Sequence, residues 1–148
     1  MQLKQIGVIH SPYKSIAAVP KATLIEKETC KLEIFSEFED ALLDIEQASH
    51  IIIFYWMDKA DRTKLQGITP IDKKKHGVFA TRAPHRPNPI GFSVVRLLKK
   101  NGTFLSVGDI TALDGTPLID IKPYVAKTDL IIGTSLDWID KTDWNANK

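Results

Sequence analysis

The sequence predicts an all-β fold, a sandwich or a barrel, with one short α-helix. Seven short segments have strand-like patterns, and no helical pattern of crossover length separates one from the next. The 148 residues, 43% of them apolar, are enough for one domain with an ordinary hydrophobic core. The glycine-rich motifs of dinucleotide-binding folds and of P-loops are both absent from the sequence, which argues against a parallel sheet.

Each predicted strand rests on a local pattern. Residues 29–35 alternate between apolar and polar side chains, the period of a half-buried strand. Residues 50–57 are β-branched or aromatic without polar alternation, which predicts a strand buried on both faces. The dipeptide Asn101-Gly102 is typical of a tight hairpin turn. The predicted strands cover residues 3–10, 29–35, 50–57, 77–81, 92–99, 103–110 and 118–122.

The helix is predicted from its cap and its apolar face. Ser36 and Glu39 have the spacing of a capping box, and the apolar residues that follow recur on one helical face as far as Ile45. Residues 58–75, by contrast, are polar and contain Gly and Pro, so they are predicted to form a long loop. Loops of that length in a compact domain are usually either functional or disordered.

Composition and run lengths place the chain among intracellular proteins. The longest apolar run, residues 51–57, is far too short to cross a bilayer as a helix. The first residues lack the apolar core of a secretory signal, so we expect a cytoplasmic protein without a membrane partner. We expect one domain over residues 1–136 and a polar tail over 137–148, whose Trp138 and Trp144 could dock back.

Charge and ligand spacing give no support to two further classes of function. The net charge of +2 is too small to indicate a nucleic-acid partner by itself. Cys30 is the only cysteine and is remote in sequence from His76 and His85, so no zinc-binding spacing exists and no metal is expected. A short basic run, residues 73–76, is typical of a solvated loop but could meet a phosphate backbone.

Residues 77–91 concentrate the chemistry-bearing side chains. Three prolines restrict this segment to extended conformations, and a pre-ordered loop loses less entropy when it binds a ligand. Arg82 and Arg86 offer planar forks that suit a carboxylate or a phosphate, and Asn88 offers the donor and acceptor that adenine recognition needs. Gly91 would let a ligand or another chain approach the backbone. The alternative is a stiff surface loop whose arginines pair with nearby acids.

A second motif follows at residues 113–124. Asp114-Gly115 predicts a tight turn. Asp120 and Lys122 lie on one face of a predicted strand, and Tyr124 shares that face if the strand continues. These three side chains could act together on a ligand, or they could form an exposed face with a weak ion pair.

The two motifs, GVFATRAPHRPNPIGFSVVRL and LDGTPLIDIKPYV, closely resemble the signature blocks of the TsaA-like family. The segments GVIHSPYK and ASHIIIFYW are also similar to that family, and the resemblance spans roughly residues 6–125. It implies a single-sheet, mostly antiparallel β-barrel, S-adenosyl-L-methionine as cofactor, and a homodimer with the cofactor near the dimer interface. The family includes a methyltransferase that acts on N6-threonylcarbamoyladenosine beside the tRNA anticodon, so tRNA is the expected partner.

Carried over by position, the resemblance implies a set of cofactor-binding residues. Two positions depart from the family pattern, because many relatives carry histidine near Asp58 and serine is common at Ala83. The implied cofactor-binding residues are Ser11, Pro12, Tyr13, Asp58, Lys59, Arg82, His85, Arg86, Asn88, Pro89, Phe92, Asp114, Gly115, Thr116 and Pro117.

The reaction expected from the resemblance is methyl transfer to a nitrogen that still carries a proton. A general base would assist, and Asp120, Tyr124 and His85 are the candidates. A purely positional mechanism, with loss of the proton to water, is the alternative. The competing functions are methylation of a small molecule, which the low net charge and the early end of the chain favour, and non-catalytic S-adenosyl-L-methionine binding by a regulator. A nucleic-acid-binding barrel without a cofactor is disfavoured, because the aromatic residues cluster in one apolar strand.

Overall fold

The computed structural model describes residues 1–20 and 28–143. The chain divides into two compact units. The first contains Met1–Asp58 and Ile90–Tyr124, and the second contains Lys59–Pro89 and the residues from Val125 onward.

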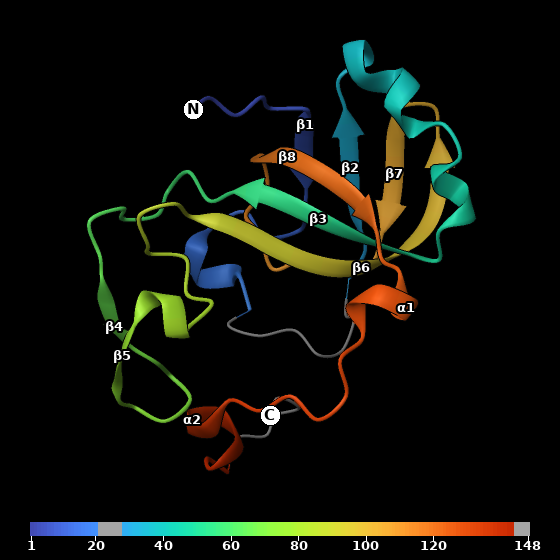
Figure 1. Cartoon of the computed structure of the whole chain (residues 1–148). Coiled ribbons are helices and arrows are strands. Elements are labelled where there is room, and N and C mark those ends of the chain that lie inside the picture. The colour runs from blue at the N-terminus through green and yellow to red at the C-terminus, as the bar shows by residue number, and fades with distance from the viewer. Residues whose placement is uncertain (21–27, 144–148) are drawn as a thin grey trace. The chain divides into compact units, whose positions relative to one another are not determined.

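The first unit consists of antiparallel strands (Figure 1). They pair in the order β1-β2-β7-β6-β3-β8, and β8 pairs again with β1, so the hydrogen-bonded ring closes. The expected all-β, mostly antiparallel fold is confirmed. The strands are β1 (Gly7–His10), β2 (Cys30–Ile34), β3 (His50–Trp56), β6 (Ile90–Asn101), β7 (Phe104–Val107) and β8 (Thr116–Pro123).

One face of the strands of the first unit supplies the hydrophobic core. The alternation predicted for β2 is confirmed, because Leu32 is fully buried and its neighbour Lys31 is exposed. The prediction that β3 is buried on both faces is wrong. Ile51 and Ile53 are fully buried, but Phe54 is only half-buried on the opposite face. An antiparallel ring has one interior, so alternate residues of an apolar strand remain on its outer surface.

The predicted α-helix at residue 36 is a 3₁₀-helix, η2 (Ser36–Leu42), followed by η3 (Ile45–Gln47). The capping box does not form, because Phe35 occupies the N-cap position and no side chain caps the helix. Asp44, with φ of 65°, interrupts the helical backbone between the two pieces. The described α-helices, α1 (Ala126–Asp129) and α2 (Asp137–Asp140), were not predicted. None of the described helices has the length and apolar character needed to span a bilayer.

The second unit is built around a two-stranded hairpin, β4 (Gln66–Ile68) and β5 (Lys75–Gly77). The predicted long loop at 58–75 therefore contains one strand and the start of another. The strand predicted at 77–81 is wrong: after β5 the chain forms a 3₁₀-turn, η4 (Val78–Ala80). Only Val78 of this turn is buried, so the local apolar pattern reflects one packed side chain rather than a sheet.

The expected docking of Trp138 is confirmed within the second unit. Its indole ring stacks on the imidazole of His76, with ring centroids 4.6 Å apart and an interplanar angle of 28°. Trp144 lies outside the described residues. Residues around α2 are thus joined to the hairpin, and not only to their neighbours in sequence.

Candidate functional site

The side chain of Arg86 stabilises the signature loop from within. Its Nη1 donates hydrogen bonds to the carbonyl oxygens of Thr81, at 2.9 Å, and Ala83, at 3.2 Å. Both hydrogens of Nη1 are therefore used by the loop backbone. The Nε and Nη2 edge donates to no other described residue, and this edge has the fork geometry that binds a carboxylate.

Arg62 holds the same loop from the preceding segment. Its Nε donates to the carbonyl oxygen of Pro87 at 2.8 Å, and its Nη2 donates to Oδ1 of Asn88 at 3.4 Å. The carboxamide of Asn88 is exposed, and with its oxygen engaged it presents Nδ2 as a donor. Sequence reasoning did not identify Arg62. Two signals were available, since the chain has four arginines and Arg62 lies in a segment whose length suggested function.

The imidazole of His85 is fixed by a backbone contact. The N–H of Asp61 donates to Nδ1 of His85 at 2.9 Å. A ring nitrogen that accepts a hydrogen bond carries no proton, so Nε2 is the protonated nitrogen of the neutral ring. His85 therefore presents a hydrogen-bond donor, and its lone pair is already engaged. Asp61 is ordered in turn by Thr63, whose hydroxyl and N–H donate to Oδ1 and lower the pKa of Asp61.

The remaining predicted residues near this loop have varied environments. Pro89 is fully buried, whereas Arg82 is exposed. The N–H of Asp58 donates to the carbonyl of Trp56. Asp58 is the last residue of the segment Met1–Asp58 of the first unit, and Lys59 is the first residue of the second unit. Among residues 1–20 and 28–143, no three His, Cys, Asp or Glu side chains are grouped so that they could hold a metal ion.

The ring of Tyr55 lies directly against Gly91, at the start of β6. A Cβ atom on Gly91 would lie 2.0 Å from Cε2 of Tyr55, which is closer than packed atoms allow. Phe92, an expected cofactor residue, lies on the outer face of the strands, where its ring is 5.7 Å from that of Phe54. Glycine at position 91 is thus explained by packing inside the protein.

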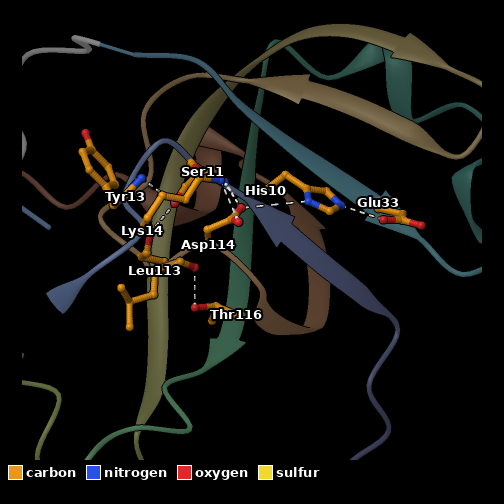
Figure 2. A network of polar contacts seen from close by, with 9 residues as sticks. His10, Ser11, Tyr13, Lys14, Glu33, Leu113, Asp114 and Thr116 are labelled. Atoms are coloured by element: carbon orange, nitrogen blue, oxygen red, sulfur yellow. Dashed lines mark hydrogen bonds and ion pairs between the residues drawn. The ribbon is translucent and has the colours of Figure 1, made fainter. Parts of the chain in front are cut away.

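In the first unit, the two expected cofactor segments around residues 11–13 and 114–117 lie against each other (Figure 2). The N–H of Asp114 donates to the carbonyl of Tyr13, and the N–H of Gly115 donates to the carbonyl of Ile9, both at 2.8 Å. Asp114 also accepts a hydrogen bond from the N–H of Ser11 at 3.0 Å. The predicted Asp114-Gly115 turn is confirmed, with φ of 82° at Gly115.

Asp114 is surrounded by basic groups. Nζ of Lys14 lies 2.7 Å from Oδ2, and Nδ1 of His10 lies 4.0 Å from Oδ1 (Figure 2). The hydrogen bond from Lys14, with that from Ser11, lowers the pKa of Asp114. The carboxylate is 30% exposed, so an ionised acceptor remains within reach of solvent.

The side chains of Ser11 and Tyr13 are directed into the protein. Oγ of Ser11 donates to the carbonyl of Ala112 at 2.7 Å. The hydroxyl of Tyr13 lies 2.9 Å from both carboxylate oxygens of Asp109, and burial together with this hydrogen bond raises the pKa of Tyr13. Both side chains therefore position the 109–116 segment. Sequence reasoning missed Asp109, since nothing in its surroundings distinguishes it from a residue at the end of a strand.

The expected face of Asp120 and Lys122 is confirmed by an ion pair. Nζ of Lys122 lies 2.8 Å from Oδ2 of Asp120, and the N–H of Ile121 donates to Oδ1 at 2.9 Å. The two side chains are 47% and 58% exposed, so the pair is solvated. Tyr124 follows β8, and its N–H donates to the carbonyl of His50, which extends the strand pairing. His85, the third candidate base, belongs to the second unit.

The signature segments described above fall within one family model. The model of the tRNA-methyltransferase O (TrmO) N-terminal domain matches residues 8–130. The chain belongs to this family. The resemblance expected from the two motifs is confirmed, and the TrmO match includes both the Thr81–Pro89 loop region and the turn at Asp114.

Similar proteins differ in length and in name. A relative from Archaeoglobus fulgidus, called a probable S-adenosyl-L-methionine-binding protein, is 50% identical over 97% of this chain and 39% of its own length. The tRNA (adenine(37)-N6)-methyltransferase of Escherichia coli is 36% identical over 84% of this chain and 57% of its own. A crystal structure of TrmO from Pseudomonas aeruginosa matches with a TM-score of 0.76 and 35% identity, covering 92% of this chain and 61% of that one. The chain thus spans less than two thirds of these three proteins.

Proposed function

We propose that the chain binds S-adenosyl-L-methionine and transfers its methyl group to N6 of threonylcarbamoyladenosine beside the anticodon of a tRNA. Membership of the TrmO family supports the reaction class. The observation that carries the proposal is the arrangement of Arg86, whose Nη1 orders the loop while its other edge is directed to no described residue. A fork fixed in this way suits the carboxylate of the cofactor.

The described residues fit the other groups of the cofactor. Asn88 presents Nδ2 as a donor, which matches the ring nitrogens of adenine. Arg82 adds a second exposed cation to the same loop. In the first unit the turn at Asp114 offers an ionised carboxylate, an acceptor of the kind that ribose hydroxyls and an ammonium group require. Each of these roles is part of the proposal.

Catalysis in this proposal is mostly positional. Bound S-adenosyl-L-methionine supplies a methyl group that is already activated by its bond to a sulfonium. The protein would contribute mainly by orienting the acceptor nitrogen toward that methyl group, because orientation alone can provide much of the acceleration. Methylation of N6 would also require a group that takes up the proton of that nitrogen. His85 is poorly suited to accept it, since its lone pair is engaged by Asp61. Asp120 and Tyr124 remain as candidate bases, with water as the alternative.

The assembly and location belong to the same proposal. The outer face of β6 carries Ile90, Phe92 and Val94, each 42% exposed, and this apolar surface supports a homodimer. The closed strand ring supports the single-sheet barrel of the family. A tRNA substrate would locate the protein in the cytoplasm. Residues 1–136 would act as the domain, with 137–148 as its tail.

A second function is favoured by the naming of one relative. The Archaeoglobus fulgidus protein, at 50% identity, is called a binding protein and not a methyltransferase. A non-catalytic regulator that binds S-adenosyl-L-methionine would need the Arg86 and Asp114 features but no base. A small-molecule methyltransferase would need the cofactor-binding features and a route for the proton, but it would not bind RNA.

The decisive experiment separates these possibilities in two steps. Isothermal titration with S-adenosyl-L-methionine and its demethylated product tests the cofactor. Incubation with tRNA from cells that lack the gene, followed by mass spectrometry of the nucleosides, tests the acceptor. A new methyl group on threonylcarbamoyladenosine is the expected result. Cofactor binding without methylated tRNA would favour the regulator or the small-molecule enzyme, and absence of binding at millimolar ligand would contradict the whole proposal.

A further inference from the structure

Positive charge is concentrated in one segment of the second unit. Residues 59–89 contain eight Lys or Arg and two Asp, a formal charge of +6, although the whole chain carries only +2. The remaining residues therefore carry a net charge of −4. The net charge of the whole chain is small because the positive and negative residues lie in different segments. A segment with a high positive charge attracts polyanions even when the net charge of the protein is small.

Three of these cations lie at the tip of the β4–β5 hairpin. Lys73, Lys74 and Lys75 are all exposed, and no described residue forms an ion pair with any of them. The turn is well defined: the N–H of Thr69 donates to the carbonyl of Lys74 at 3.0 Å, and Lys73 adopts a left-handed φ of 60°. The three ammonium groups are therefore presented by a fixed turn.

The acid nearest to these lysines in sequence is committed to holding the turn. Oδ1 of Asp72 accepts hydrogen bonds from Oγ1 of Thr69, at 2.6 Å, and from the N–H of Lys74, at 3.0 Å. Its Oδ2 lies 2.9 Å from Nε2 of His76, and the side chain is only 8% exposed. The charge of Asp72 thus orders the hairpin from inside and leaves the lysine side chains directed to solvent.

Large apolar side chains are exposed on the same hairpin. Phe79 is 84% exposed, Ile68 is 70% exposed and Leu65 is 67% exposed. Ile68 is the register partner of Lys75, and the carbonyl of Leu65 accepts the N–H of Val78, next to Phe79. An exposed aromatic ring in a segment rich in Lys and Arg, such as Phe79 here, is a surface on which unpaired bases stack. The sequence pattern alone had suggested that aromatic residues avoid the basic segments.

We propose that residues 65–79, here called the basic hairpin, bind RNA, with the three lysines on backbone phosphates and Phe79 against an unpaired base. The inference rests on the proposed function, because it names the surface through which the RNA substrate is held. Lysine is a mobile, hydrated point charge, which suits phosphates that need no fixed orientation. Such contacts are independent of base sequence and sensitive to salt.

The test uses fluorescence anisotropy of a labelled, unmodified RNA stem–loop with the sequence of an anticodon arm, over a series of KCl concentrations. The test variant is Lys73→Gln/Lys74→Gln/Lys75→Gln. The matched control is Lys4→Gln/Lys31→Gln/Lys99→Gln, which removes the same charge from exposed positions of the first unit. Phe79→Ala forms a separate arm. Titration with S-adenosyl-L-methionine on the same samples verifies that each variant is folded.

We expect the hairpin triple variant to bind RNA about tenfold more weakly or worse, and the salt slope to fall by about 2–3, because each phosphate contact contributes roughly 0.7–0.9 to it. Phe79→Ala should weaken binding several-fold at an unchanged slope. An equal loss in the control triple variant, or no loss in the hairpin variant, would overturn the proposal. The proposal would also be overturned if the parent bound anionic vesicles and not the RNA, and if the hairpin triple variant lost that vesicle binding. That result would assign the hairpin to a lipid surface.

The two proposals fail in different ways. A parent protein that binds S-adenosyl-L-methionine but no RNA would leave the cofactor function standing and remove the basic hairpin as an RNA surface. A parent protein that binds RNA through the hairpin but no cofactor would support the surface and contradict methyl transfer.

Discussion

Nε1 of Trp138 donates a hydrogen bond of 3.1 Å to the carbonyl oxygen of Ala80. This contact joins α2, near the end of the described chain, to the last residue of η4, two positions before Arg82. With the stack on His76, it places one indole ring against both the hairpin and the start of the signature loop. The segment that follows Val125 therefore contributes to the order of the loop.

Replacement of Trp138 should loosen this region. Trp138→Ala removes the hydrogen bond and the stack and should lower the free energy of unfolding by about 1–2 kcal/mol, whereas Trp138→Phe retains a ring and should cost about half as much. Hydrogen exchange of the amides of residues 78–86 is the sensitive measurement. Leu136→Ala, an exposed neighbour, is the control. Unchanged exchange in Trp138→Ala would show that the loop is ordered without the tail.

Replacement of Arg86 should weaken cofactor binding for two reasons. Arg86→Ala removes the ligand fork and also the hydrogen bonds to Thr81 and Ala83, so the loss should reach about 1.5–3 kcal/mol. Arg86→Lys should also weaken binding, since a point charge cannot replace a bidentate fork. Isothermal titration gives the affinities, with the exposed Arg96→Ala as the control. Parent-like affinity in a folded Arg86→Ala protein would assign the carboxylate to Arg82 or to neither arginine.

The ion pair of Asp120 and Lys122 offers a way to identify the base. If Asp120 accepts the proton, Asp120→Asn should slow single-turnover methyl transfer by about 10²–10⁴-fold with little change in cofactor affinity. Lys122→Gln is the matched control, because it breaks the same exposed ion pair but leaves the carboxylate in place, so its turnover should stay close to that of the parent. Normal turnover in a folded Asp120→Asn protein, or an equal loss in Lys122→Gln, would exclude Asp120 as the base and leave Tyr124 or water.

Low pH should lower the stability of the second unit, because Asp72 then becomes protonated. The hydrogen bond from Thr69, supported by those from Lys74 and His76, holds the pKa of Asp72 well below its usual range. The folded state therefore keeps this carboxylate ionised where the unfolded chain protonates it. Its contribution to stability is complete above about pH 5 and declines as the pH falls below about 4.

Thermal unfolding between pH 3 and pH 7 tests this expectation, with pH steps chosen around the unfolded pKa of about 3.9. Asp72→Asn should be less stable than the parent at neutral pH, and the difference should shrink as the pH falls. The control is Asp137→Asn, since Asp137 pairs with Lys141 at an exposed position. If the difference in stability between the parent and Asp72→Asn does not change with pH, the side chain of Asp72 stabilises the hairpin without its charge, and the prediction is wrong.

Features with a short-range cause could be predicted from the sequence. The alternation of β2 follows from strand period, and the two turns at Gly102 and Gly115 follow from the left-handed φ that glycine allows, 61° and 82° here. The helix at residue 36 could not be predicted correctly. An apolar repeat specifies which face is buried, but it does not distinguish an α-helix from the tighter 3₁₀ turns observed.

Residues of the candidate site could be predicted where they belong to a motif of the family. Residues whose role depends on contacts with distant parts of the sequence could not. Arg86 and Asp114 were identified from their motifs. Arg62 and Asp109 were not, because their roles arise from partners about 25 and 96 residues away in sequence. The glycine at position 91 had suggested room for a ligand, and only the ring of Tyr55 lying over it explains the requirement.

The single thiol of the chain lies on the inner face of β2. Cys30 is 1% exposed, and burial raises its pKa, so the reactive thiolate is rare in the folded protein. An alkylating reagent can reach it only when β2 separates from its neighbours β1 and β7. The rate of thiol labelling therefore reports how often the strand ring opens, with the natural sequence as its own probe. A ligand that binds the closed ring should slow that labelling in proportion to its occupancy.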